Sequence, residues 1–156
     1  MATICPDALA ALRRHAREEY PDECCGVVLV LADGSARALR IRNIQDVMHA
    51  KDPEAYPRSA RTAYAGHPAD LRTALEQADE PGCRLVAFYH SHPDHDAYFS
   101  AEDTAQATPF GEPSYPDALQ VVVSVRDRHI HEIKAFVWSD AGAAYVETPL
   151  EEEFPK

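Results

Sequence analysis

The residues best suited to chemistry are concentrated in one stretch, from His90 to Asp103. His90 and His92 are two positions apart after an apolar run, and side chains at i and i+2 of an extended chain leave on the same face. Asp103 follows eleven residues after His92, where the chain has had room to turn back towards the histidines. Two imidazoles and one carboxylate are three protein ligands, the number that a catalytic zinc ion uses while its fourth position stays open for water.

A simpler interpretation of these residues is also open. The chain has eight histidines, so some cluster by chance, and Ser100 with Asp103 has the spacing of a helix capping box. The full pattern fixes five positions. His-x-His is followed by seven residues, the first of which is Pro. Ser comes next, and Asp follows after two more residues. At average residue frequencies, this pattern would arise by chance at any one starting position of a sequence roughly once in 10⁷. We therefore favour a metal site.

The elements that must position these residues can be predicted from periodicity. Residues 6–20 have apolar side chains at helical spacing, and a proline follows. The aliphatic run 26–31, an Asp-Gly turn and the alternating run 38–42 predict two strands. Residues 43–66 are polar and show little periodicity, so we expect an irregular surface segment beside a binding cleft.

The second half of the chain continues the alternation of helix and strand. Helical spacing returns between Pro68 and Pro81, and residues 83–89 predict a buried strand that delivers its end at His90. A loop follows, a short helix is expected to begin at Ser100, and two further strands are expected at 119–125 and 130–138. Neither a repeat nor a second domain is indicated.

Composition limits the classes of function. With 156 residues, 46% hydrophobic and 26% charged, the chain can form one domain with a sizeable core. A formal charge of −11 opposes binding to nucleic acids and to anionic membrane surfaces. Apolar runs of the ~18 to 20 residues needed to cross a bilayer and the features of a secretion signal are both missing from the sequence. We expect a cytoplasmic protein whose four cysteines are reduced thiols.

The pattern resembles the signature of the JAMM metallopeptidases, the JAB1/MPN/MOV34 family. In that family an upstream glutamate lies near a Cys-Gly pair at the start of the first strand, and this chain has YPDECCG there, with Glu23 as the matching residue. Taken alone, an acid after Pro-Asp could simply face solvent. The order of helices and strands resembles the family over nearly the whole chain.

The resemblance implies a fold and a mechanism. It implies a single α/β domain with three α/β/α layers, a mixed sheet flanked by helices and a cytidine-deaminase-like architecture. The domain spans residues 1–150, and residues 151–156 form an acidic tail. It also implies one Zn²⁺ per chain, held by His90, His92 and Asp103, with Glu23 as general base and Ser100 as a hydrogen-bond donor to the oxyanion.

The resemblance further implies a substrate. Relatives hydrolyse the amide made by the C-terminal glycine of a ubiquitin-like protein, and the short bacterial forms resemble those acting on sulfur-carrier proteins, releasing for example cysteine. The expected partner is therefore a carrier with a Gly-Gly tail, with residues 43–66 and 93–99 lining its channel. A non-catalytic MPN scaffold, a zinc hydrolase of small amides, and a homodimer all remain open.

Overall fold

The computed structural model describes residues 2–152. The elements in chain order are β1 (Ala2–Ile4), α1 (Pro6–Glu19), β2 (Cys25–Val30), β3 (Ala36–Ile41), α2 (Gln45–Lys51), α3 (Pro68–Ala78), β4 (Arg84–Pro93), α4 (Ala101–Ala107), β5 (Leu119–Arg126), β6 (His129–Ser139), β7 (Ala144–Thr148) and β8 (Leu150–Glu152). None of the helices formed by these residues combines the length and apolar composition that a membrane crossing requires.

A mixed sheet of six strands forms the centre of the molecule. Its strand order is β3-β2-β4-β5-β6-β7, and β4 and β5 run parallel whereas every other neighbouring pair is antiparallel. A separate parallel pair joins β1 to β8. The parallel pair β4 and β5 requires a crossover connection, and α4 lies on that connection.

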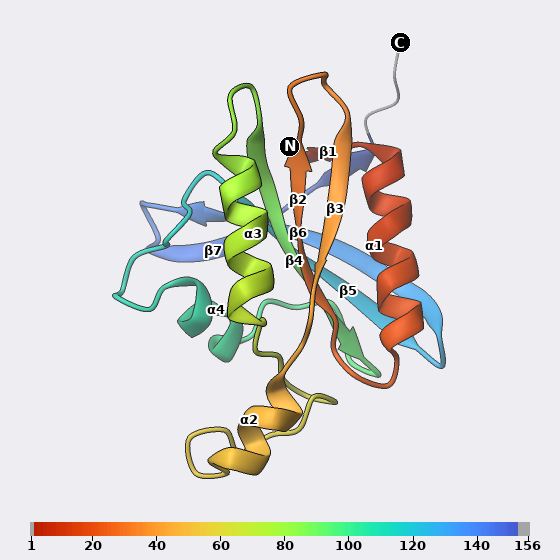
Figure 1. The fold of residues 1–156 in the computed structure, drawn as a ribbon, viewed down its shortest axis with the longest axis vertical. Helices are drawn as coiled ribbons and strands as arrows, with labels where there is room; N and C mark the ends of the chain where they lie inside the picture. The colour runs from red at the N-terminus through yellow and green to blue at the C-terminus, as the bar shows by residue number, and fades with distance from the viewer. Residues whose placement is uncertain (1, 153–156) are drawn as a thin grey trace.

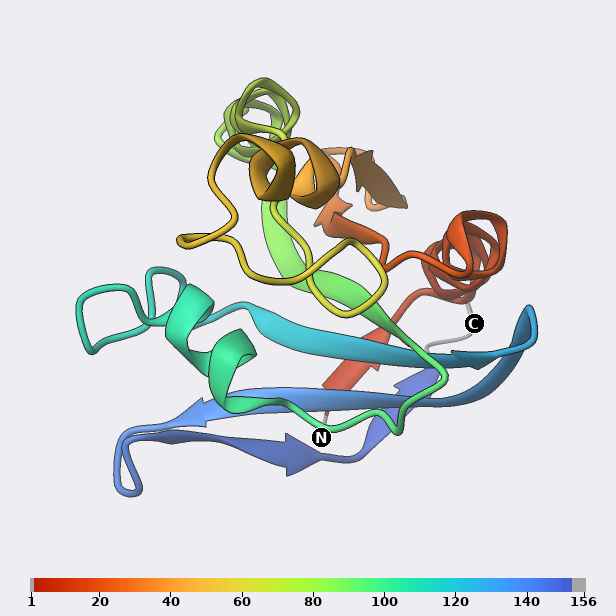
Figure 2. The same ribbon diagram turned by 90° about the horizontal axis from the view of Figure 1, so that it is seen from below.

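Two helices cover opposite faces of this sheet (Figures 1 and 2). On one face α1 packs Leu9 and Leu12 against a cluster that includes Val28. On the other face α3 packs against Val27 and Leu29 of the same strand. Successive strand residues point to opposite faces, so a continuous aliphatic run serves both cores. The expected α/β fold, with a mixed sheet flanked by helices, is confirmed.

The structure corrects the sequence-based outline in several places. Residues 43–66 are not wholly irregular, because α2 occupies Gln45–Lys51. This helix buries only the polar Gln45 and so leaves no apolar periodicity. Strands β1, β7 and β8 were not expected; they are short or half exposed. The segment expected as an acidic tail begins inside β8, whereas residues 153–156 lie outside the described part of the chain.

Candidate metal centre

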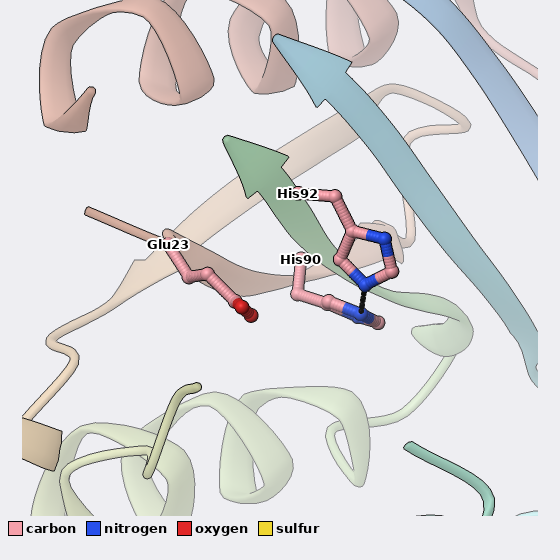
Figure 3. A group of neighbouring side chains, drawn as sticks. All are labelled: Glu23, His90 and His92. Atoms are coloured by element: carbon pink, nitrogen blue, oxygen red, sulfur yellow. Dashed lines mark hydrogen bonds between the residues drawn. The ribbon is translucent and has the colours of Figure 1, made fainter. Parts of the chain in front are cut away.

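The end of β4 brings the two histidines together. Phe88, His90 and His92 follow one another at every second position of the strand, so their side chains leave on the same face. Phe88 packs on the α3 side of the sheet, and both imidazoles therefore lie on that side. Both rings are buried, and their Nε2 atoms lie 3.1 Å apart (Figure 3). The ring of Tyr64 stacks on His90 with centroids 4.8 Å apart. Burial and stacking therefore hold the pair in place.

Asp103 completes the group from the first turn of α4. Its Oδ2 atom lies 3.1 Å from Nε2 of His90 and 3.3 Å from Nε2 of His92. Two ligands bound to one zinc ion at 2.0 to 2.1 Å with tetrahedral angles are separated by about 3.3 Å. The three donor atoms therefore already have the separations that ligands of a single ion require.

A hydrogen bond from the far side of the ring orients His92. Its Nδ1 atom lies 2.9 Å from the carbonyl oxygen of Asp96. A carbonyl only accepts hydrogen bonds, so Nδ1 carries the proton and donates it. The lone pair is then on Nε2, the nitrogen that faces His90 and Asp103. Such a contact from the outer shell is the usual way of fixing a metal-binding tautomer.

The protonation states also suit a metal. Burial lowers the pKa of His90, which favours the neutral ring. Burial alone raises the pKa of Asp103, but its hydrogen bonds with His90 and His92 outweigh that effect and hold the pKa well below its usual range. Neutral imidazole and ionised carboxylate are the forms that bind metal ions.

Glu23 reaches the same place from the chain segment before β2. Its side chain is 5% exposed, and one carboxylate oxygen lies within 4.8 Å of a ligand nitrogen of each histidine (Figure 3). Its backbone N–H donates to the carbonyl of Ala60 at 2.7 Å, and Asn43 donates to its carbonyl at 2.8 Å. Glu23 therefore does not face solvent.

Its surroundings shift the protonation of Glu23 strongly. Burial, followed by the neighbouring carboxylate of Asp103, raises the pKa of Glu23 to about 9. Arg58 acts in the opposite direction. A buried carboxyl group with a raised pKa, close to several other titratable side chains in a cavity, is typical of a general acid-base residue.

Ser100 caps the helix that carries Asp103. Its Oγ accepts from the Asp103 N–H, and its own N–H donates to Oδ2 of Asp103, both at 3.0 Å. The expected helix start is confirmed, and the capping box is present. Because Oγ acts as an acceptor here, its hydroxyl hydrogen is free for another oxygen.

A cavity of about 440 Å³ opens beside these residues. Glu23, His92, Ser100 and Asp103 lie on its wall. Residues from both segments expected to border a cleft also line it: Arg58, Thr62, Ala63 and Tyr64 from residues 43–66, and His95 and Tyr98 from residues 93–99.

Sequence reasoning missed three residues of this site: Asn43, Arg58 and Tyr64. Each lies in the aperiodic segment, and each reaches its contact across a long separation in the chain. The sequence carries no local pattern that marks them.

Residues 6–139 match the family described as prokaryotic homologs of the JAB domain. The chain belongs to this family. It is 36% identical over 130 residues to the CysO-cysteine peptidase of Mycobacterium tuberculosis, covering 83% of this chain and 77% of that protein. It is 32% identical over 111 residues to the desampylase of Haloferax volcanii, covering 68% and 72%.

A solved structure supports the fold of this JAB-domain protein. The JAB1/MPN domain protein from Archaeoglobus fulgidus superposes with a TM-score of 0.52 at 16% identity, over 97% of this chain and 98% of the other. The family and the relatives named as a peptidase and a desampylase place the chain among hydrolases of the JAMM type.

Proposed function

We propose that this JAB-domain protein is a zinc-dependent peptidase that hydrolyses the amide bond after the C-terminal glycine of a ubiquitin-like or sulfur-carrier protein. One observation carries the proposal: Nε2 of His90, Nε2 of His92 and Oδ2 of Asp103 converge within 3.1 to 3.3 Å, with the buried carboxyl of Glu23 beside them.

The donor set fits one zinc ion per chain. Two neutral imidazoles and a carboxylate leave a fourth position open for water or substrate, as in other hydrolytic zinc sites. When bound, zinc supplies Lewis acidity, which polarises a carbonyl group and makes water a strong nucleophile at neutral pH. Glu23 is the fourth acidic or imidazole side chain at the site. Since His90, His92 and Asp103 already supply the three protein ligands of a catalytic zinc ion, we assign Glu23 to proton transfer.

Glu23 moves the proton in this mechanism. Its carboxylate takes a proton from the attacking water and returns it to the nitrogen of the leaving amine, a role usually worth about 10² to 10⁴ in rate. A nearby cation favours the ionised carboxylate and so brings the proton affinity of Glu23 down from its raised value. The hydrogen bonds of its main chain to Ala60 and Asn43 fix the backbone that carries this carboxyl group.

Ser100 stabilises the charge that develops on the carbonyl oxygen. Its hydroxyl lies on the cavity wall next to Asp103 and has its hydrogen free to donate. One such donor is typically worth about 10² to 10³ in kcat.

The substrate assignment rests on the relatives and on the cavity. One relative is named for an adduct of CysO with cysteine and another is a desampylase. The cavity lies between residues 58–64, residues 95–98 and α4, and we propose that it admits a Gly-Gly tail because glycine lets the backbone approach the site closely.

We also propose a cytoplasmic location. All four cysteines, Cys5, Cys24, Cys25 and Cys83, are free thiols. Burial raises the pKa of Cys24 to about 12. Unpaired cysteines are typical of a reducing compartment.

The decisive experiment incubates the purified protein with carrier adducts from the same organism, with and without a chelator. We expect chelator-sensitive release of an amine, identified by mass spectrometry. A carrier tail ending in Val-Val instead of Gly-Gly should be cleaved much more slowly, and equal turnover would remove the tail-channel assignment.

The same assay separates the alternatives. Bound zinc without hydrolysis, unaffected by Glu23→Gln, would favour a non-catalytic scaffold. Equal cleavage of a short peptide with the same terminal bond would favour a hydrolase of small amides.

A further inference from the structure

We propose that Arg58 binds the free α-carboxylate of the amino acid on the leaving side of the scissile bond. The inference rests on the proposed function and narrows it. The preferred substrate is a carrier whose Gly-Gly end is extended by one amino acid, rather than a carrier joined to a lysine side chain of another protein.

Arg58 differs in charge from the other ionisable residues of the cavity wall. Among the described residues that line it, Arg58 is the one lysine or arginine, whereas Glu23, Glu102 and Asp103 contribute carboxylates. The zinc ion that we propose is held by Asp103 and the two histidines, and its open position serves water and the scissile carbonyl. Arg58 is therefore the side chain of this lining that offers a permanent positive charge to a substrate carboxylate.

The backbone at Arg58 is tied to α2. Gln45, which is buried, donates from Nε2 to the Arg58 carbonyl at 3.0 Å. Two residues later Ala60 donates its N–H to Asp46 at 2.7 Å.

The same short segment also holds the proposed general base. The Ala60 carbonyl accepts the N–H of Glu23 at 2.7 Å. The backbone of Arg58 is therefore anchored two residues from the contact that holds the backbone of Glu23, so the same few hydrogen bonds place the two residues relative to each other.

An ion pair with Glu102 holds the Arg58 guanidinium and occupies only part of its hydrogen-bonding capacity. Its Nη2 atom lies 2.6 Å from Oε1 of Glu102, and both side chains are about half exposed. A guanidinium has five N–H donors in a planar fork, and a carboxylate can accept two of them in parallel. Glu102 thus holds the side chain at the cavity wall, and the guanidinium has further N–H donors for a substrate carboxylate.

The chemistry of the two substrate types differs at this point. An amino acid attached through its α-amine carries a carboxylate a short distance from the new amide. A lysine attached through its side-chain amine has its α-carbon five bonds from the amide nitrogen instead of one, inside a polypeptide and without a free carboxylate. A fixed guanidinium near Glu23 therefore discriminates in favour of the former.

The test uses one carrier protein extended after Gly-Gly by a single cysteine, prepared as the free acid and as the C-terminal amide. We expect wild-type protein to cleave the acid with a kcat/KM about 10- to 100-fold above that of the amide, the range of a charge-assisted pair. Arg58→Gln should bring this ratio close to 1 by slowing cleavage of the acid alone. Arg61→Gln is the matched control, because Arg61 is exposed in the same segment and does not line the cavity.

Binding gives a second readout that does not depend on turnover. In the Glu23→Gln background, calorimetry should show tighter binding of the acid than of the amide, and adding Arg58→Gln should remove that difference. An acid-to-amide ratio near 1 in wild-type protein, or an equal loss on both substrates in Arg58→Gln, would overturn the inference while leaving the peptidase function standing. Cleavage of neither adduct would instead contradict the proposed function, and the inference would fall with it.

Discussion

Nε2 of His90 and Nε2 of His92 face each other at 3.1 Å, and both lie within 3.3 Å of a single oxygen of Asp103. Strand alternation alone places the two rings on the same side of β4, but it does not make their nitrogens converge. The convergence is produced by Tyr64 stacked on His90 and by the hydrogen bond from His92 to Asp96. These contacts hold the donor atoms in the arrangement that the zinc ion we propose requires.

Zinc binding is the first prediction. We expect one zinc ion per chain in wild-type protein, and a loss of affinity of more than about 100-fold in His92→Ala, because even outer-shell partners are worth 10- to 100-fold. Metal content after dialysis, measured by mass spectrometry, checks this. His95→Ala is the control, since this nearby histidine is exposed and should keep a full equivalent of zinc. Equal zinc content in both variants would contradict the site.

Glu23→Gln should separate chemistry from metal binding. We expect kcat to fall by about 10² to 10⁴, because an amide cannot accept the proton, while zinc content stays at one equivalent. Glu19→Gln, four residues earlier and exposed, should leave kcat unchanged. If Glu23→Gln lost its zinc, the residue would be a ligand rather than a base, and our assignment of roles would be wrong.

Ser100 has two roles that substitutions can separate. Ser100→Ala should lower both the free energy of unfolding, by about 1 kcal/mol, and kcat, by about 10² to 10³, because the variant loses the helix cap and the donor. Ser100→Gly should recover most of the stability, since glycine is tolerated as an N-cap, but not kcat. Ser100→Thr should recover both. Urea titrations and steady-state kinetics check these effects, and a kcat that followed stability across the series would rule out the donor role.

The parts of this protein that are predictable from sequence follow local rules. Strand alternation predicts that His90 and His92 share a face, and capping spacing predicts that α4 begins after Ser100; the structure shows both. The continuous aliphatic run of β2 predicts a strand buried on two sides. Each of these rules involves residues close together in the chain.

The parts that were missed depend on contacts across the chain. Tyr64 reaches His90, and Asn43 reaches the backbone of Glu23, from a segment without periodicity. Helix α2 could not be predicted from apolar periodicity, because its buried residue is the polar Gln45. Strands β1 and β8 are three residues each and are stabilised by pairing with each other, which no local pattern reports.

His15 should make stability depend on pH. Its Nδ1 lies 2.8 Å from the Tyr89 hydroxyl in the core. Burial, with a smaller effect from Arg40, lowers its pKa from 6.5 to about 4. Between these values the unfolded chain binds more protons than the folded one, so this contribution to stability is fully present above pH 6.5 and is lost as pH falls to 4. The full loss is about 3 kcal/mol.

Urea unfolding of His15→Gln and wild type at pH 7 and pH 4.5 checks this dependence. The variant should be less stable than wild type at pH 7, and the difference should shrink at pH 4.5. His129→Gln, at an exposed position, should follow the wild-type curve. A difference between His15→Gln and wild type that stays constant with pH would show that His15 does not titrate between these values.

Gly26 allows β2 to lie against the strand that carries the histidines. A methyl group at this position would lie 2.3 Å from the Cζ and Oη atoms of Tyr89 and 2.5 Å from the carbonyl oxygen of Leu39. One of these neighbours is backbone and the other is a buried ring, so neither can move cheaply. We expect Gly26→Ala to lower the free energy of unfolding by about 1 to 3 kcal/mol or more. Gly142→Ala, whose nearest neighbour is 3.7 Å away, is the control, and an equal effect in both variants by urea titration would show that the approach of Tyr89 to Gly26 is not tight.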